Sequence, residues 1–299
     1  MSRLKALLLA ASALIGVLAI CWIAGKLWID ARESAADVTL PAAFPGRLIE
    51  VEGHPVRISE RGAGPALILV AGTGGSVASW PEPVLARLAV DHHVIAVDLF
   101  GMGFSERSEE FTYGFGLWSR QLVSLLDTLG IERASVVGHS LGGTVVIFFA
   151  ANHPDRVERV VLAGSAISIP WWFPVLMVPG PGELFLASHE VFGPTFSPAH
   201  RAEALAAYRI PGTRAALLHY VRHSIPEARE LLPAVAAVRA PVLQLHGTAD
   251  EEVSFSAAER LQTQLHDSRL VAIEGAGHYL MVDAPERFAS EVETFLSTR

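Results

Sequence analysis

A serine stands at the apex of a short turn between two apolar segments, within "ASVVGHSLGGTVVIFFA" (134–150). Gly138 and Gly142 flank Ser140 two positions before and after it, and Gly143 follows. A turn sharp enough to join a buried strand directly to a helix brings the flanking positions together and leaves no room for side chains. Unusual backbone postures of this kind are typical of functional sites. The pattern therefore predicts a nucleophile elbow that presents the Ser140 hydroxyl at the amino end of a helix.

A serine hydroxyl needs a general base, and the base needs an acid that orients it. Asp250 follows the apolar run "PVLQLHG", and His278 follows the apolar run "RLVAIEG". Because the carboxyl ends of parallel strands meet at one edge of a sheet, both side chains are expected over the same edge as Ser140. We therefore predict that Ser140, Asp250 and His278 are the catalytic residues.

Several other polar residues lie near these three in the sequence. Glu251 and Glu252 neighbour the predicted acid and are the alternatives to it. His139 should point away from the nucleophile, His246 ends a strand, and Asp98 should hydrogen-bond the turn in "DLFGMGFS". The histidines show no metal-ligand spacing, so we expect neither a metal nor another cofactor.

The elements that must position these residues alternate along the chain. Short apolar runs, typical of buried strands, alternate with amphipathic helical patterns over 47–166 and again over 238–299. Such alternation is typical of βαβ units with helices on both faces of the sheet. The sequence therefore predicts an α/β fold with a mostly parallel, doubly wound sheet.

Residues 167–237 interrupt this alternation, because they contain no strand pattern. A segment of this length is too long for a connecting loop. It predicts a helical cap over the carboxyl edge of the sheet, with helices over 198–208, 213–223 and 227–237.

The cap begins with "IPWWFPVLMVPGPG", which is apolar and too interrupted by prolines to form one regular helix. Three aromatic residues stand together in it: Trp171, Trp172 and Phe173. They are candidates for the wall of an acyl pocket. Contact with a bilayer and a place in the core of the cap are the alternatives for the same side chains.

Ala6 to Gly25 is a run of twenty residues without a charge. As a helix it would be about 30 Å long, which is the thickness of the hydrocarbon core of a bilayer. We predict a transmembrane signal anchor over residues 1–30 and a tether over residues 31–46. A cleaved signal peptide is the alternative, since it also places an apolar segment near the N-terminus.

The flanks of this apolar run bear on its orientation. Trp22 and Trp28 stand near its far end, where interfacial aromatic residues are expected. Arg3 and Lys5 favour an N-terminus on the inner side of the membrane. The catalytic part would then lie on the outer side, periplasmic or extracellular.

Composition excludes other classes of protein. The chain has 299 residues, 51% of them hydrophobic, and a formal net charge of −8, which is untypical of a disordered chain. No basic cluster with interleaved aromatic residues is present, so nucleic acid is not an expected partner. Cys21 is the one cysteine, so no intramolecular disulfide can form.

Over residues 47–299 the sequence resembles the α/β-hydrolase superfamily, in its capped branch of esterases and lipase-like enzymes. The motifs that carry the resemblance are "LVAGTGGS", "VDLFGMGFS", "VVGHSLGG", "LHGTADEEV" and "GAGHYLMVDAPE". The resemblance implies a catalytic triad in the chain order serine, acid, histidine. It also implies an oxyanion hole made by the backbone N–H groups of Leu141 and Thr73. The family usually has His-Gly where this chain has Ala71-Gly72, a departure that concerns the geometry of that loop.

The resemblance implies metal-free hydrolysis of a small carboxylic ester, and the apolar start of the cap favours an apolar acyl group. Ser140 excludes the members of the superfamily that attack with aspartate. C–C bond hydrolases and cofactor-free perhydrolases share the serine triad and are the alternatives. The former often carry Trp after the catalytic histidine, where this chain has Tyr279. A membrane-tethered binding protein without activity is the alternative from another class, but such proteins usually lose a triad member.

Overall fold

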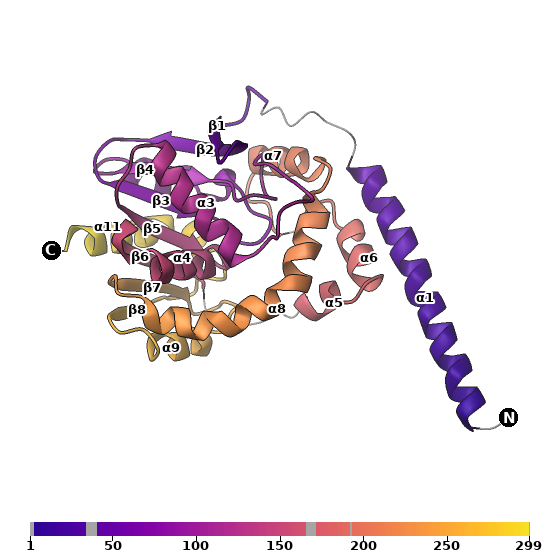
Figure 1. The fold of residues 1–299 in the computed structure, drawn as a ribbon. Helices are drawn as coiled ribbons and strands as arrows, with labels where there is room; N and C mark the ends of the chain where they lie inside the picture. Colours follow the sequence, from indigo (N-terminus) through magenta and orange to yellow (C-terminus); the bar gives the residue numbers. More distant parts are fainter. Residues whose placement is uncertain (1–2, 34–40, 166–171, 192, 299) are drawn as a thin grey trace.

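A computed structural model of the chain describes residues 3–33, 41–165, 172–191 and 193–298. Its centre is one sheet of eight strands in the order β1-β2-β4-β3-β5-β6-β7-β8 (Figure 1). The strands are β1 (Arg47–Val51), β2 (His54–Arg61), β3 (Ala66–Val70), β4 (His93–Val97), β5 (Ala134–His139), β6 (Val157–Ala163), β7 (Val242–Gly247) and β8 (Ser268–Ile273). The pairings β1–β2 and β2–β4 are antiparallel, and every other pairing in this sheet is parallel.

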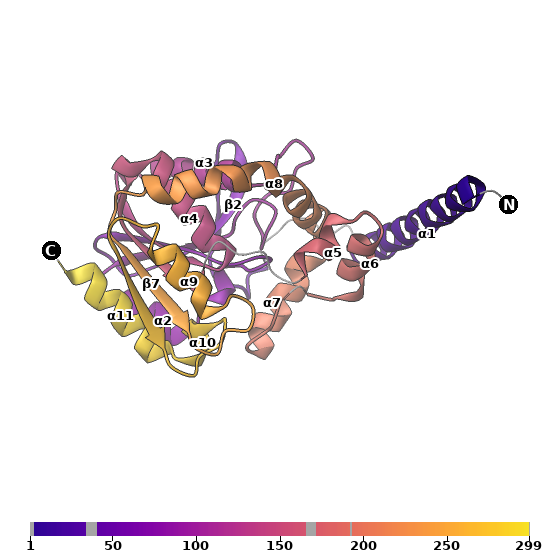
Figure 2. The ribbon, with the colours of Figure 1, turned by 90° about the horizontal axis from the view of Figure 1, so that it is seen from below.

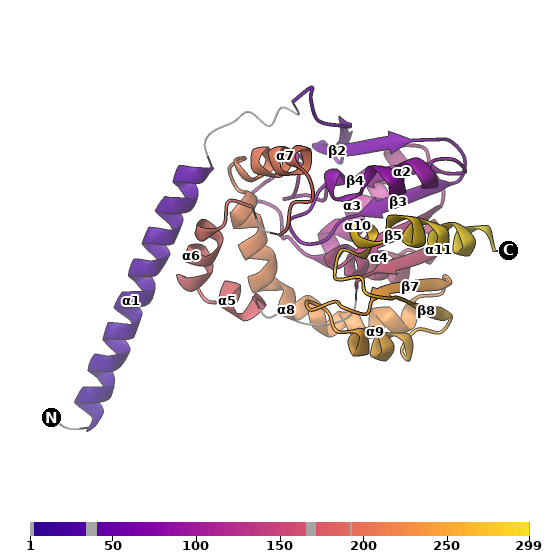
Figure 3. The ribbon, with the colours of Figure 1, turned by 180° about the vertical axis from the view of Figure 1, so that it is seen from behind.

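Helices cover both faces of this sheet. One face carries α3 (Phe115–Thr128), α4 (Leu141–Asn152) and α9 (Phe255–Gln262), and the other carries α2 (Glu82–Leu88) and α11 (Pro285–Ser297). Figure 3 shows α2 and α11 together on the same side. All residues of β3, β5 and β7 are buried, as expected of central strands covered on both faces. The predicted doubly wound α/β fold is confirmed.

The described residues between β6 and β7 form four helices, which we call the cap. They are α5 (Phe173–Met177), α6 (Pro181–Ser188), α7 (Pro198–Tyr208) and α8 (Thr213–Ala237). From residue 172 onward the opening segment forms two short helices, in keeping with its prolines. The prediction of separate helices over 213–223 and 227–237 is wrong, because α8 is one helix of 25 residues. It is bent (Figure 1), and a proline such as Pro226 in a helix interior bends a helix without having to end it.

Helix α1 (Arg3–Arg32) precedes the sheet and lies beside the cap (Figure 2). Among the described residues, Lys5–Arg32 is the one helical segment long and apolar enough to cross a bilayer, with a mean hydropathy of 2.6. The helix ends two residues beyond the predicted anchor, so Ala31 and Arg32 are helical, while residues 34–40 of the predicted tether lie outside the described residues.

Two glycines allow α1 to pack closely against α6. A Cβ atom at Gly25 would lie 2.6 Å from Glu183 Cβ, and one at Gly180 would lie 2.6 Å from the Leu18 carbonyl oxygen. Any side chain larger than hydrogen at either position would therefore separate the two helices. The contact places the turn before α6 at the level of Leu18, well inside the apolar run of α1.

Glu33, at the end of α1, joins this helix to the start of α8. Its carboxylate accepts hydrogen bonds from the backbone N–H groups of Gly212 (2.8 Å) and Arg214 (2.9 Å). It also pairs with the Arg214 guanidinium at 3.2 Å, where both side chains are almost fully buried. The N-terminal helix is thus part of the packed structure of the cap.

Candidate active site

Ser140 occupies the turn between β5 and α4 in a strained conformation. Its φ is 52° and its ψ is −119°, a region that residues other than glycine rarely adopt. The glycines around it are required by close contact: a Cβ at Gly138 would lie 2.3 Å from the Gly142 carbonyl oxygen. The turn is held by the Ser140 N–H, which donates to the Ala163 carbonyl at 3.0 Å, and by Ser165 Oγ, which donates to the Ser140 carbonyl at 2.7 Å.

Asp250 and His278 meet at the carboxyl ends of β7 and β8. His278 Nδ1 lies 2.9 Å from Asp250 Oδ2, and both side chains are buried. The other carboxylate oxygen, Oδ1, accepts from the backbone N–H groups of Glu252 (2.9 Å) and Val253 (2.8 Å). A hydrogen bond from Nδ1–H to the carboxylate leaves Nε2 as the nitrogen that can accept a proton.

Asp250 is held in its ionised form by these contacts. Burial acts to raise the pKa of Asp250, but the hydrogen bond and charge of His278 and the N–H of Val253 outweigh it. The pKa of Asp250 therefore lies below its usual value. An ionised carboxylate at this position can both orient the imidazole and stabilise an imidazolium.

The two glutamates considered as alternative acids do not take this position. Glu252 Oε2 approaches the opposite ring nitrogen of His278, with 3.9 Å to Nε2, and its side chain is half exposed. The side chain of Glu251 is exposed to solvent. The geometry therefore brings Asp250, rather than either glutamate, to the Nδ1 side of His278.

His139 and His246 contact the backbone of the segments that carry His278 and Asp250. His139 Nε2 lies 3.0 Å from the His278 carbonyl oxygen, and burial together with the charge of His278 lowers the pKa of His139 to about 3. His139 is therefore neutral, and its Nε2–H fixes the backbone of His278. His246 Nε2 lies 2.7 Å from the Val253 carbonyl oxygen, on the loop that surrounds Asp250.

The loop after β3 approaches the nucleophile closely. A Cβ atom at Gly72 would lie 3.0 Å from Ser140 Cβ, and Thr73 lines the same cavity as Ser140. Leu141 is the first residue of α4, so its N–H has no acceptor within the helix. The positions of Thr73 and Leu141 are compatible with two N–H donors beside Ser140.

A buried polar network ties this loop to the cap. Glu203 on α7 accepts from Arg57 Nη1 at 2.6 Å and from Ser76 Oγ at 3.1 Å. Asp98 approaches the same nitrogen of Arg57, with 3.7 Å between Oδ2 and Nη1, and all three charged side chains are buried. The role of Glu203 could not be predicted from the sequence, because its partners are 127 and 146 residues away along the chain. Through Ser76, the cap is connected to the loop that contains Thr73.

Asp98 holds its turn as the sequence suggested. Its two carboxylate oxygens accept from the backbone N–H groups of Val77 and Phe104, each at 2.7 Å. Burial raises the pKa of Asp98 to about 6, although Arg57 and these two hydrogen bonds act in the opposite direction. Asp98 is buried beneath the loops and is not among the described residues that line the cavity at Ser140.

Ser140 and His278 face a cavity of about 210 Å³. Its described lining residues are Thr73, Ser140, Trp172, Phe185, His189, Gly193, Glu252, Val253, His278 and Tyr279. Of the three predicted pocket residues, Trp172 is among them, whereas Phe173 packs against the hydrophobic core and Trp171 lies outside the described residues. Phe185 was not predicted. The apolar stretch "LFLA" on α6 is the sequence signal that could have indicated Phe185.

Within residues 3–33, 41–165, 172–191 and 193–298, no group of three or more His, Cys, Asp or Glu side chains is arranged to hold a metal ion.

Known proteins similar to this chain indicate the class of protein to which it belongs. The profile described as "alpha/beta hydrolase fold" matches residues 65–180, and the profile described as "TAP-like protein" matches residues 221–299. A 2-hydroxymuconate semialdehyde hydrolase of Pseudomonas sp. (strain CF600) is 30% identical over 276 residues, which cover 84% of this chain and 94% of that protein. The chain belongs to the α/β-hydrolase fold family.

Two solved structures add to this comparison. The esterase RhEst1 from Rhodococcus sp. ECU1013 is 31% identical, with a TM-score of 0.66 over 85% of this chain and 99% of its own. A membrane phospholipase A is 24% identical, with a TM-score of 0.67 over 99% of this chain and 98% of its own. The latter match therefore takes in α1. The relatives therefore include a hydrolase of 2-hydroxymuconate semialdehyde as well as an esterase.

Proposed function

We propose that this chain is a membrane-anchored serine hydrolase that cleaves carboxylic esters with an apolar acyl group. The observation that carries the proposal is the character of the cavity at Ser140. Its described lining includes the aromatic side chains of Trp172, Phe185 and Tyr279, and it includes neither Arg nor Lys. Such a surface favours an uncharged, apolar group beside the nucleophile.

In this mechanism His278 Nε2 takes the proton of Ser140 while Ser140 Oγ attacks the acyl carbon. Asp250 holds the imidazole in the required tautomer. The N–H groups of Leu141 and Thr73 stabilise the oxyanion, and one such donor contributes about 3–4 kcal/mol in other serine hydrolases. His278 then gives the proton to the leaving alcohol, and water hydrolyses the acyl-enzyme by the reverse of the same steps.

C–C bond hydrolysis is the second candidate, because of the 30% identity to a hydrolase of 2-hydroxymuconate semialdehyde. A related enzyme is described as acting on a heptadienoate, which carries a carboxylate. A cavity suited to an anion would offer an arginine or a lysine, but its described lining has neither, and besides the imidazoles of His189 and His278 its ionisable residues include the carboxylate of Glu252. The carboxylate of Glu252 would repel the carboxylate of a dienoate substrate, so the charges in the cavity favour an uncharged ester.

The contact between α1 and the cap supports a substrate that arrives from the bilayer. The apolar run of α1 ends at Gly25, and Leu18 lies about 10 Å further along the helix toward its N-terminus. Gly180 packs at the level of Leu18, so α6 begins at hydrocarbon depth if α1 crosses the membrane. Helix α6 also contributes Phe185 to the cavity. A relative whose match includes α1 is described as a membrane phospholipase.

The orientation of the chain in the membrane belongs to the same proposal. Lys5 and Arg3 precede the apolar run, which places the N-terminus inside and the catalytic part on the periplasmic or extracellular side. The proposed partners are the membrane and a small apolar ester.

The dependence of activity on acyl length tests this proposal. Across p-nitrophenyl esters from acetate upward, kcat/KM should rise by up to about fourfold per added methylene until the cavity is filled. Replacement of both Trp172 and Phe185 by alanine should flatten this rise and spare the acetate ester, because the shortest acyl group does not reach them.

Phe173→Ala is the matched control, since Phe173 neighbours Trp172 but packs in the core. It should leave the slope of the chain-length series unchanged. An equal loss at every chain length in the Trp172→Ala/Phe185→Ala variant would mean that these two side chains only support the cap, and the proposal of an apolar acyl pocket would be wrong.

A further inference from the structure

A second cavity, of about 270 Å³, lies where the end of α1 meets the cap. Arg32 from α1 and Arg209 and Arg214 from the cap line it, together with Glu190 and Tyr208. It shares none of its described lining residues with the cavity at Ser140. The mechanism proposed above makes no use of it.

The charges in this second cavity are not balanced by the described residues. Arg214 is paired with Glu33, and Glu190 is paired with Arg201 at 2.6 Å. Among the described residues, neither Arg32 nor Arg209 has a carboxylate partner. The described lining of the cavity therefore holds three arginines and one carboxylate, and two of the arginines have no carboxylate partner, in a chain whose net charge is −8.

Arg32 carries a further unsatisfied group. Its Nε is buried and has no hydrogen-bond partner among the described residues, while its guanidinium lies 5.4 Å from the centre of the Trp28 ring. A buried N–H of a guanidinium without an acceptor is costly, and an acceptor with negative charge would relieve it. The geometry of a guanidinium suits the oxygens of a phosphate better than a single point acceptor.

The position of the cavity along α1 places it near the membrane interface. This step rests on the proposed anchoring of α1 in the membrane. Ala31, on the cavity wall, is six residues beyond Gly25, or about 9 Å along the helix. The headgroup region on each side of a bilayer is about 5–8 Å thick, so Ala31 lies at the outer edge of that region, where it meets water. Trp22 and Trp28 are exposed near the same end of α1, as residues of an interfacial belt are.

We propose that this cavity binds the phosphate of an anionic phospholipid headgroup, through Arg32 and Arg209. Arg214 is already saturated, since it also donates to the carbonyl oxygens of Tyr208, His189 and Glu190. It forms the wall of the site and keeps α1 joined to α8. A lipid bound between Arg32 and Arg209 would connect the membrane helix to α7 through its headgroup.

Binding to full-length protein in neutral detergent micelles tests the proposal. The probes are a short-chain diether phosphatidylglycerol, the matching diether phosphatidylcholine, and inorganic phosphate. Ether lipids contain no ester bond, so the result does not depend on the proposed hydrolytic activity. Phosphatidylglycerol should bind at least about tenfold more tightly than phosphatidylcholine, whose choline cation is repelled by the two arginines.

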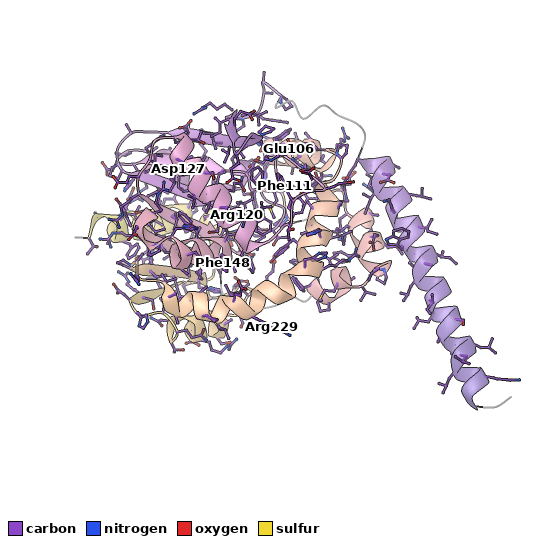
Figure 4. The ribbon with its side chains drawn as sticks, in the orientation of Figure 1. Glu106, Phe111, Arg120, Asp127, Phe148 and Arg229 are labelled. Atoms are coloured by element: carbon purple, nitrogen blue, oxygen red, sulfur yellow. The ribbon has the colours of Figure 1, made fainter. Side chains whose placement is uncertain are left out.

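The variant Arg32→Gln/Arg209→Gln should raise the Kd for phosphatidylglycerol by about tenfold or more, because charged hydrogen bonds are lost. The control is Arg120→Gln/Arg239→Gln, which removes the same charge at two exposed positions away from α1 (Figure 4 shows Arg120 on α3). The control should bind the lipid as the unmodified protein does. Both variants keep Arg214, and an unchanged circular dichroism spectrum and melting temperature would show that each is folded.

Equal loss of binding in both variants, or no loss in Arg32→Gln/Arg209→Gln, would overturn the proposal. Inorganic phosphate should bind far more weakly than the lipid, because only the lipid is presented at the interface by its chains. If inorganic phosphate binds as tightly, and binding is lost in the same variant, the site recognises free phosphate and the lipid is not its ligand.

Discussion

Replacement of Ser140 or of His278 by alanine should each reduce kcat for an ester by about 10⁶-fold, and the double variant should be hardly worse than either single one. The reason is that the serine attacks only when the histidine removes its proton, so losing either residue removes the same step. The measurement is turnover of a short p-nitrophenyl ester by the purified full-length protein, with thermal unfolding as the test of an intact fold.

Labelling with a fluorophosphonate accompanies these kinetics. The reagent should modify the unmodified protein on Ser140 and leave Ser140→Ala unlabelled. Losses that multiply in the double variant would show that the two residues act in separate steps. Labelling that persists in Ser140→Ala would place the nucleophile elsewhere.

Asp250→Asn should lower kcat by about 10⁴-fold, the effect of the same replacement in a serine protease. The carboxamide can donate to Nδ1 and so stabilise the tautomer in which Nε2 carries the proton, which makes His278 unable to accept one from Ser140. The mutant should still react slowly with a fluorophosphonate, because the nucleophile and the oxyanion donors are unchanged.

Glu252→Gln is the matched control for Asp250→Asn, because Glu252 lies on the same loop and 3.9 Å from the other ring nitrogen of His278. It should change kcat by less than about tenfold, as expected for a half-exposed charge. If Glu252→Gln or Glu251→Gln is the damaging substitution instead, the assignment of the acid to Asp250 is wrong.

Local patterns were enough to predict the sheet and the positions of the three proposed catalytic residues. The elbow at Ser140 is specified within five residues, since Gly138 and Gly142 are needed by its own turn. Asp250 and His278 are placed by the ends of β7 and β8, which are short apolar runs bounded by glycine. Each of these features depends on neighbours in the chain, which is the information that a single sequence carries.

The partners of buried charges could not be predicted in this way. Glu33 meets Arg214 across 181 residues, and Glu203 meets Arg57 across 146 residues. Nothing in the local sequence of either glutamate indicates a buried position, because most glutamates are exposed. For this reason the contact of α1 with the cap, and that of the cap with the loop at Thr73, are seen only in the structure.

The cap was also the least predictable part of the fold. Its prolines correctly excluded one long helix at its start, but the helical patterns suggested two helices, over 213–223 and 227–237, where the structure has the single bent helix α8. The pocket prediction depended on adjacency in sequence, so it grouped Phe173 with Trp172. Consecutive residues on a helical turn point in different directions, and Phe185 from the next helix takes the position beside the cavity instead.

The measurement that tests the central claim most directly compares two substrates on the same purified full-length protein. One is p-nitrophenyl octanoate, and the other is 2-hydroxy-6-oxo-2,4-heptadienoate, the substrate named for a relative. We predict that kcat/KM for the ester exceeds that for the dienoate by on the order of 100-fold or more, because the dienoate brings a carboxylate into a cavity whose described lining holds Glu252 and neither Arg nor Lys. Octanoate trapped on Ser140, seen as a mass increase on the peptide that contains it, should accompany ester turnover. A kcat/KM for the dienoate equal to or above that for the ester would contradict the account and identify the chain as a C–C bond hydrolase.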